Sequence, residues 1–288
     1  MRRVFVRTSK GQYGFWFAAQ WVGGSNKGKW MFMKQLFGVV VLALAGLAHS
    51  QEVQNAAHFA LLNKCRDALE VDRQSADAAR VCLASEAAVA KTAPFSSTRL
   101  ALVLLLTGAA ENNNPALAQP GAKAYQLKVA ELSPKVNKND PDRVVEDLIG
   151  VAKYFDHAED WVTALAYFER DWKLALQSKT QAVSLEKRVL DEVDASFYRR
   201  RENPTPAYVL ADDILWKQRR YAHAQAHSGA DDGPIAQEAL ALGKLYIEAK
   251  DKPNATQVTQ RALTIYRTRG DKTRTGWAQQ QLKEIADL

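Results

Sequence analysis

Apolar residues recur at intervals of three and four through most of the chain, and short polar turns separate one apolar run from the next. The first such run contains Phe59, Leu62, Cys65 and Leu69. This spacing places apolar side chains on one face of an α-helix, whereas a half-buried strand needs strict alternation of apolar and polar residues, which the sequence does not show. Residues 51–288 are therefore expected to form an all-α domain.

Turn signals divide the helical region into segments of similar length. Clusters of Asn, Pro, Gly and Ser interrupt the apolar pattern at residues 112–115, 119–121, 133–134, 140–141, 203–206, 228–234 and 251–253. Ser133-Pro134 is typical of a helix end, and Asp140-Pro141 is typical of a helix start with a capping Asp. The spacing predicts about five helix pairs and a terminal helix over residues 272–288.

Charge is distributed unevenly along the chain. The first fifty residues hold seven of the 39 Lys and Arg residues and none of the 32 Asp and Glu residues, so the rest of the chain is formally neutral despite the net charge of +7. Non-specific binding to nucleic acid depends on unbalanced basic residues that contact phosphate. No nucleic-acid partner is therefore expected.

A targeting segment explains the basic N-terminal region. Lys34 precedes an apolar run over residues 36–48, and Ala48 and Ser50 occupy the positions where signal-peptidase sites carry small residues. This pattern predicts cleavage before Gln51 and hence a periplasmic or secreted protein. An uncleaved membrane anchor is the alternative, although a spanning helix needs about 20 apolar residues and this run is shorter.

The chain is accordingly expected to have three regions. Residues 33–50 form the signal peptide, and residues 51–288 form the mature helical domain, for which no membrane span is expected. Residues 1–32 show no helical or strand period, and Met31 and Met33 offer later translation starts. The first 32 residues are therefore interpreted as a start-site artefact or an unstructured leader.

Helix pairs of similar length suggest internal repeats. The best repeat spans residues 236–269, where a Leu-Gly-x-x-Tyr signature in the first helix is followed by two small residues in the second. The matching residues are Leu242, Gly243, Tyr246, Ala255 and Ala262. This segment resembles a tetratricopeptide repeat (TPR). The resemblance implies stacked helical hairpins that form a right-handed α-solenoid.

Two further segments match the same family less well. In residues 145–178 the packing positions are held by Leu148, Val151, Ala152, Phe155, Ala164 and Phe168. Asp171, however, takes a place that the family gives to a small residue. In residues 188–219 the register is carried by Ala195, Tyr198 and Ala207, while Asp194 stands where a large apolar residue is expected. A plain helical bundle or another helical repeat is the alternative.

The two Cys residues fall at facing positions of the first helical hairpin in the register that the resemblance implies. Cys65 and Cys82 are seventeen residues apart. An exported protein meets an oxidising compartment, and an even number of Cys residues suits a disulfide there. A Cys65–Cys82 disulfide is therefore predicted. The alternative is two buried thiols that act as small apolar residues.

Catalytic motifs are absent from the sequence, which has no Walker loop, GxSxG, CxxC, HExxH or dinucleotide-binding motif. His223 and His227 have the spacing of two metal ligands on one helix, and Asp231 and Asp232 would complete a site if their loop folded back. Surface histidines near a helix end are the preferred interpretation. No catalytic residue, metal or cofactor is therefore predicted.

Arg and Trp residues also form recognisable groups. Two Arg runs, residues 199–201 and 219–220, are expected in the last turns of helices, on a solvated face where cations are favourable. Core packing is expected for Trp161, Trp172, Trp216 and Trp277, which keep helical spacing from other apolar residues.

The repeat resemblance implies a binding face on the first helix of each pair. In the family, positions two, nine and thirteen of that helix point into a groove that binds peptides or protein segments. Here these positions are held by Glu146, Lys153, His157, Gln237, Lys244 and Glu248. All six are polar, which suits a polar peptide, and the titration of His157 would make binding sensitive to pH. An ordinary solvated helix face explains the same polarity.

The sequence therefore predicts an exported protein-binding or peptide-binding scaffold or adaptor of the cell envelope. A metal-dependent or hydrolytic enzyme built on a helical repeat is one alternative, and a structural spacer is another.

Overall fold

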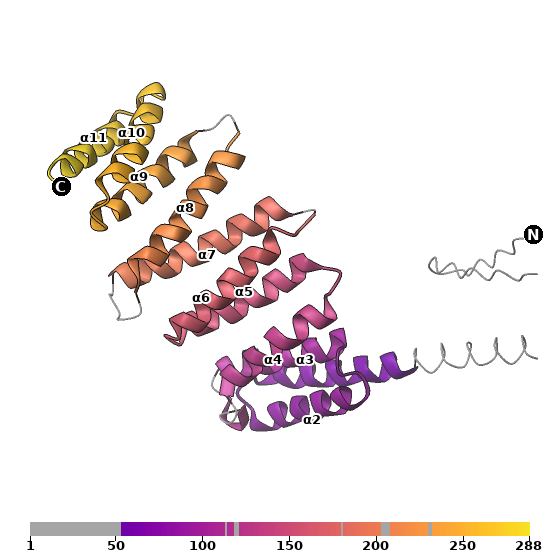
Figure 1. Cartoon of the computed structure of the whole chain (residues 1–288). Coiled ribbons are helices and arrows are strands. Elements are labelled where there is room, and N and C mark those ends of the chain that lie inside the picture. The colour runs from indigo at the N-terminus through magenta and orange to yellow at the C-terminus, as the bar shows by residue number, and fades with distance from the viewer. Residues whose placement is uncertain (1–52, 113, 118–120, 180, 203–207, 230–231) are drawn as a thin grey trace, which may run out of the picture. The chain divides into compact units, whose positions relative to one another are not determined.

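The structure is a computed structural model. It describes residues 53–288 except for residues 113, 118–120, 180, 203–207 and 230–231 (Figure 1). The predicted leader and signal peptide, residues 1–32 and 33–50, lie outside the described residues. Residues 57–288 form one compact unit.

The described residues are almost entirely helical, and no strand occurs among them. A helix covers residues 53–71 of the described part. It is followed by α2 (Ala76–Thr92), α3 (Ser97–Glu111), the short 3-10 helix η1 (Pro115–Leu117), α4 (Gly121–Val136), α5 (Pro141–His157), α6 (Trp161–Ala175), α7 (Ala182–Glu202), α8 (Leu210–His227), α9 (Gly233–Glu248), α10 (Lys252–Thr268) and α11 (Lys272–Ala286). The predicted all-α fold is confirmed.

Polar residues at the turns determine where most helices begin. At the start of α5, Asp140 accepts a hydrogen bond from the Arg143 backbone N–H at 3.1 Å, and Pro141 occupies the first helical turn, as predicted. Comparable side-chain caps are supplied by Ser75, Ser96, Asp160, Asp251 and Asp271. Each cap satisfies a backbone N–H that has no partner within the first helical turn.

The end of α4 differs from the prediction, because this helix continues past Pro134 to Val136. Ser133 is fully buried and donates a hydrogen bond to Oδ2 of Asp147 on α5 at 2.7 Å. The Asn137 backbone N–H also reaches the Ser133 carbonyl at 2.8 Å. Packing against the next helix therefore extends α4 beyond the local stop signal.

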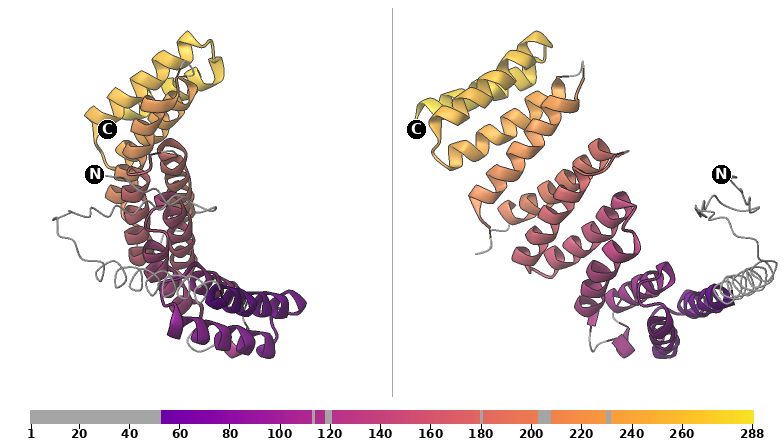
Figure 2. Two further views of the ribbon diagram at one scale, coloured as in Figure 1. Left: turned by 90° about the vertical axis from the view of Figure 1, so that its right-hand side faces the viewer. Right: turned by 45° about the vertical axis from the view of Figure 1, so that its right-hand side comes forward.

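Each helix packs against the one that follows it in the chain, from α2 to α11. In addition, α5 contacts α7, the first helix of the next pair, and α9 contacts the terminal helix α11. The views in Figures 1 and 2 agree that consecutive helices lie side by side. This pairwise stacking is an all-α helical repeat arrangement.

The close approach of helices in the α9–α11 region depends on Gly243. A Cβ atom at this position would lie 2.2 Å from Nε2 of Gln281 and 2.6 Å from Oγ1 of Thr259. Both neighbouring side chains are themselves buried, and they hydrogen-bond to each other at 3.1 Å. The residues matched to the repeat signature here are buried: Leu242, Gly243, Tyr246, Ala255 and Ala262.

In the α5–α6 pair, too, the six apolar residues matched to the repeat signature are all buried.

The third segment, on α7, departs from its predicted register. Tyr198 is 55% exposed, whereas its neighbour Phe197 is 1% exposed and packs edge-to-face on Trp161. The core-facing stripe of α7 is therefore shifted by one residue from the predicted one. Ala207 lies outside the described residues.

Cys65 and Cys82 form a disulfide, as predicted. The bond joins the helix over residues 53–71 to α2, with a Cα–Cα distance of 4.6 Å. Both residues are fully buried in an apolar cluster with Leu69, Val89 and Leu102. The disulfide therefore holds the first helical hairpin together at its core.

The predicted core role of the Trp residues is confirmed for two of them. Trp161 and Trp216 are buried, while Trp172 is half-buried and meets the Trp216 ring edge-to-face. Trp277 is 58% exposed, so its predicted burial is wrong. The buried face of α11 carries Ala278, Gln281 and Ile285, and Trp277 lies outside that face.

Arg199, Arg200 and Arg201 lie in the last turn of α7, as predicted. The expected solvated face is confirmed for Arg199, which is exposed, but it is wrong for Arg200 and Arg219. Arg200 is 6% exposed and pairs with Asp156 on α5 at 2.8 Å. Arg219 lies in the middle of α8, contacts both carboxylate oxygens of Glu169 on α6 and stacks 4.4 Å from the Trp216 ring centre. Carboxylates on neighbouring helices, distant in sequence, thus position these cations between helices.

Asp194 likewise pairs with a cation of a neighbouring helix. It stands where the repeat pattern expects a large apolar residue, but it forms an ion pair with the buried Lys217 of α8. Lys217 also lies 3.5 Å from Glu238 on α9, and Arg220 bonds the other oxygen of Glu238 at 2.7 Å. Buried charge pairs therefore replace apolar contacts along α7, α8 and α9.

Candidate functional site

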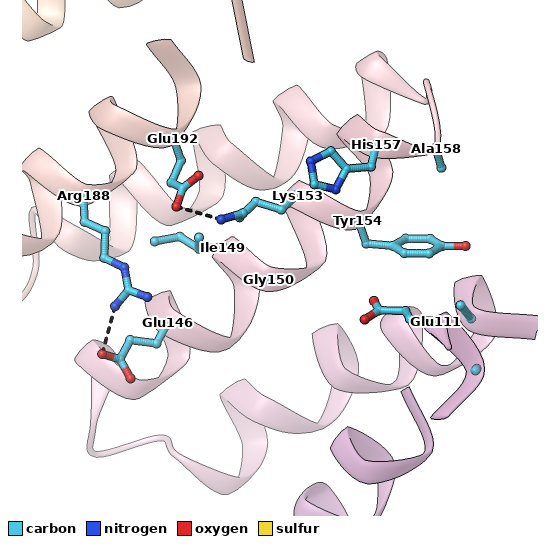
Figure 3. Close-up of a pocket in the computed structure, with 12 residues that line it drawn as sticks. Glu111, Glu146, Ile149, Gly150, Lys153, Tyr154, His157, Ala158, Arg188 and Glu192 are labelled. Carbon is cyan, nitrogen blue, oxygen red and sulfur yellow. Dashed lines mark hydrogen bonds and ion pairs between the residues drawn. The ribbon is translucent and has the colours of Figure 1, made fainter. Parts of the chain in front are cut away.

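A pocket of about 730 Å³ lies on one face of α5, between α3, α7 and the start of α4 (Figure 3). The lining residues are Ala110, Glu111, Ala122, Glu146, Ile149, Gly150, Lys153, Tyr154, His157, Ala158, Arg188 and Glu192. Half of them belong to α5 and recur every three or four residues, so they share one face of this helix. Gly150 has no side chain, which leaves the middle of the pocket wall open.

Three of the six predicted binding residues line this pocket: Glu146, Lys153 and His157. Their spacing of seven and four residues places them along one face of α5, and Figure 3 shows Lys153 and Glu146 directed toward α7. Glu146 and His157 are exposed, and Lys153 is half-buried. The structure thus brings these predicted positions to one concave surface.

Ion pairs between α5 and α7 set the electrostatics of the pocket. Nζ of Lys153 lies 2.9 Å from Oε1 of Glu192, and a guanidinium nitrogen of Arg188 lies 3.1 Å from Oε1 of Glu146. Arg143 lies 3.4 Å from the other oxygen of Glu146. Because these side chains are partly exposed, each pair contributes no more than about 1 kcal/mol, so a ligand can separate them at low cost.

The opposite end of the pocket is formed by α3, α4 and the last turn of α5. Glu111 accepts a hydrogen bond from Nε2 of Gln126 at 2.6 Å. Figure 3 shows the Tyr154 ring directed toward this end, near Glu111. Small residues, Ala110 and Ala122, form the remaining wall. This end therefore combines an aromatic surface with a hydrogen-bond acceptor.

The predictions did not include Glu111, Tyr154, Arg188 or Glu192 among the site residues. Arg188 and Glu192 are four residues apart on α7, so they share a helix face, but nothing in the sequence indicates that this face lies against α5. The contact between α5 and α7 depends on how successive helix pairs stack. Of these four residues, only Tyr154 could have been found from the sequence, because it follows Lys153 on α5 and continues the three- and four-residue spacing of the predicted face.

The other three predicted residues, Gln237, Lys244 and Glu248, lie on α9. All three are exposed. None of them lines the pocket on α5. The two predicted sets therefore occupy separate helices, and the pocket contains only the first set.

His223 and His227 lie in the last part of α8, with ring centres 4.7 Å apart. Glu186 of α7 brings a carboxylate to them, and the ligand atoms of the three side chains all lie within 4.8 Å of one another. Of the two Asp residues that were considered as further ligands, Asp231 lies outside the described residues, and Asp232 forms an ion pair with Arg269 at 3.1 Å. The acidic neighbour is therefore a residue that the sequence did not single out.

No described helix is both long and apolar enough to cross a membrane.

No protein-family model matches the chain. No curated protein matches it in sequence. A solved structure that resembles it is the crystal structure of BtubC (BKLC) from P. vanneervenii, with a TM-score of 0.39 and 14% sequence identity over 82% of this chain and 91% of that chain.

Proposed function

We propose that the chain is an exported tetratricopeptide-type protein that binds a polar peptide segment of a protein partner in the pocket on α5. The observation that supports this proposal is the pocket itself, whose lining includes Glu146, Lys153 and His157 of α5 together with Arg188 and Glu192 of α7. Its volume lies within the range of about 300–1,000 Å³ that is typical of ligand sites. The disulfide and the signal-peptide pattern support export.

The chemistry of the lining favours a peptide of mixed polarity. A peptide backbone carries both donors and acceptors, and the pocket offers both kinds of group, since Lys153 and Arg188 donate while Glu111, Glu146 and Glu192 accept. Their charges largely offset one another, so a strongly acidic or strongly basic ligand gains little. Tyr154 supplies an aromatic surface at one end.

The positions on α9 give a matched comparison for testing this proposal. Polar peptides would be selected by phage display on the purified chain, and the dissociation constant of a selected peptide would be measured for two double variants. Lys153→Ala/His157→Ala removes two groups of the pocket, and Lys244→Ala/Glu248→Ala removes two exposed groups of α9. Both changes affect exposed or half-buried side chains, so we expect helix content and Tm to change little.

We expect the α5 double variant to bind at least about tenfold more weakly, equivalent to about 1.4 kcal/mol, and the α9 variant to bind as the wild type does. Loss of binding in the α9 variant alone would assign the ligand to that helix. Full binding in both variants would contradict a groove on the first helices. If the chain were an enzyme, it would turn over the selected peptide. If it were a structural spacer, phage display would select no binding peptide.

A further inference from the structure

Three metal-ligand side chains meet where the beginning of α7 lies beside the end of α8. His223 and His227 are one helical turn apart on α8, and their ring centres are 4.7 Å apart. Glu186 approaches them from α7, and one ligand atom from each of the three lies within 4.8 Å of the others. Residues of two helices, α7 and α8, thus form one cluster. A chance pair of histidines on a single helix would lack the ligand from a second helix.

We propose that Glu186, His223 and His227 form a site for a divalent transition-metal ion of the zinc class. Two imidazoles and one carboxylate are a ligand set that suits Zn²⁺, with a fourth position left for water. A softer ion would need thiolate, and both Cys residues of this chain are in a disulfide. A harder ion such as Ca²⁺ prefers oxygen ligands only.

A hydrogen bond around His223 supports this assignment. Nε2 of His223 lies 3.1 Å from the backbone carbonyl oxygen of Val183 on α7. A ring that donates from Nε2 to a carbonyl carries its lone pair on Nδ1, and metal-bound histidines commonly orient their second nitrogen in this way. This contact favours the tautomer of His223 that leaves Nδ1 free to bind an ion.

The surrounding cations do not compete for the carboxylate of Glu186. Lys187 pairs with Asp191 at 2.6 Å, and Arg188 pairs with Glu146. Arg220 of α8 is occupied by Asp191 and Glu238. Neighbouring positive charges are thus compensated by other acids, so Glu186 can approach the histidines.

Binding requires a modest rearrangement of these side chains. Ligands about 2.0–2.1 Å from a tetrahedral Zn²⁺ lie roughly 3.3 Å from one another, so the three atoms must approach by up to about 1.5 Å. His227 is exposed, and Glu186 and His223 are half-buried, so rotation of the side chains can supply this movement. A bound ion would then link α7 to α8 near the end opposite their connecting segment.

Metal binding is tested by equilibrium dialysis of the tag-free chain against Zn²⁺, with the bound metal counted by mass spectrometry. We expect about one ion per chain and a rise in Tm of about 3 °C or more with saturating Zn²⁺, because the ion binds the folded state. Glu186→Gln keeps the shape of the side chain and removes its charge, and we expect at least about tenfold weaker binding. His223→Ala should abolish binding at the same concentration.

His157→Ala is the matched control, since it removes an exposed histidine from another part of the chain and should leave the zinc content unchanged. Equal zinc content in the wild type, Glu186→Gln and His223→Ala would overturn the site. Sensitivity to His223→Ala without sensitivity to Glu186→Gln would overturn the link between α7 and α8. Peptide binding is not the readout, so the outcome is independent of the pocket on α5.

Discussion

Asp156 and Asp171 lie on consecutive helices, and both are buried, but their surroundings differ. Burial by itself raises the pKa of Asp156, yet hydrogen bonds from Ser196, Arg200 and Arg199 outweigh it, so the pKa is lowered overall. Burial raises the pKa of Asp171 to about 9, and Arg170 offsets this only in part. Both carboxyl oxygens of Asp171 are buried without a hydrogen-bond partner.

Replacement of Asp171 should stabilise the protein. A carboxyl whose pKa is about 9 when folded and about 3.8 when unfolded lowers stability as the pH rises from about 4 to about 9, by on the order of 4 kcal/mol at pH 7. Asp171→Ala removes this penalty and leaves a small cavity, so we expect a net gain of about 1–3 kcal/mol at pH 7.

Urea unfolding at pH 5 and pH 8 checks this prediction. The wild type should lose stability between the two values, and Asp171→Ala should lose less. A variant that is less stable than the wild type at both pH values would show that Asp171 has a favourable role in the fold.

Removal of Asp156 should have the opposite effect. Arg200 is 6% exposed, so Asp156→Ala leaves a buried guanidinium without its carboxylate and should cost about 3–5 kcal/mol. Because the folded pKa of Asp156 is lowered, its contribution is present above about pH 4 and is lost as the pH falls through the folded pKa. Thermal melts at pH 7 and pH 3 measure both effects, with Glu131→Ala as a control in an exposed pair. If Asp156→Ala lost no more stability than Glu131→Ala, the result would contradict the buried ion pair between Asp156 and Arg200.

At the scale of helices, replacement of Gly by Ala should change the free energy of unfolding in opposite directions at two positions. Gly150 lies on the exposed face of α5, and a Cβ there meets no atom within 4 Å, so Gly150→Ala should raise the free energy of unfolding by about 0.5–1 kcal/mol. Gly243→Ala would press on Thr259 and Gln281, and we expect a loss of about 1–3 kcal/mol that exceeds the gain in helix propensity. Denaturation midpoints of the two variants test this contrast. Equal shifts would mean that α9 and α10 do not pack as closely as described.

Most helix boundaries could be predicted from the sequence, because the turns carry their own chemistry. Asp140 and Asp251 cap the helices that follow them, and each precedes Pro or Lys-Pro. The prediction that a helix ends at Ser133-Pro134 was wrong, because the contact that extends α4 comes from Asp147, which belongs to the next helix. Local signals thus predict a boundary only where packing does not override them.

The register of α5 was predictable because seven apolar residues dominate its buried face, although Asp147 and Asp156 also lie on it. The longer α7 buries only five apolar residues, and Asp194 and Arg200 form interhelical ion pairs beside them. A pattern based on apolar residues therefore favoured Tyr198 over Phe197. For the pocket, Glu146, Lys153 and His157 followed from their helical spacing, whereas their partners on α7 depend on stacking between helix pairs.

At the scale of the whole molecule, the disulfide constrains the beginning of the helical domain. A closed loop of 17 residues should contribute about 3 kcal/mol by restricting the unfolded chain. Treatment with a reductant should therefore lower the unfolding temperature, and the double variant Cys65→Ala/Cys82→Ala should not respond to it. Denatured protein should take up no thiol label before reduction. Full labelling of both residues without reductant would show that the bond is absent.

The central claim is that a peptide occupies the pocket on α5, and filling the pocket tests it most directly. Gly150→Trp places a large side chain in the pocket wall at a position with open space, whereas Gly276→Trp makes the same change at an exposed, open position of α11. The measurement is the dissociation constant of a selected polar peptide for both variants. Binding should be lost in Gly150→Trp, with Tm retained, and should be unchanged in Gly276→Trp. Wild-type affinity in Gly150→Trp would contradict the claim.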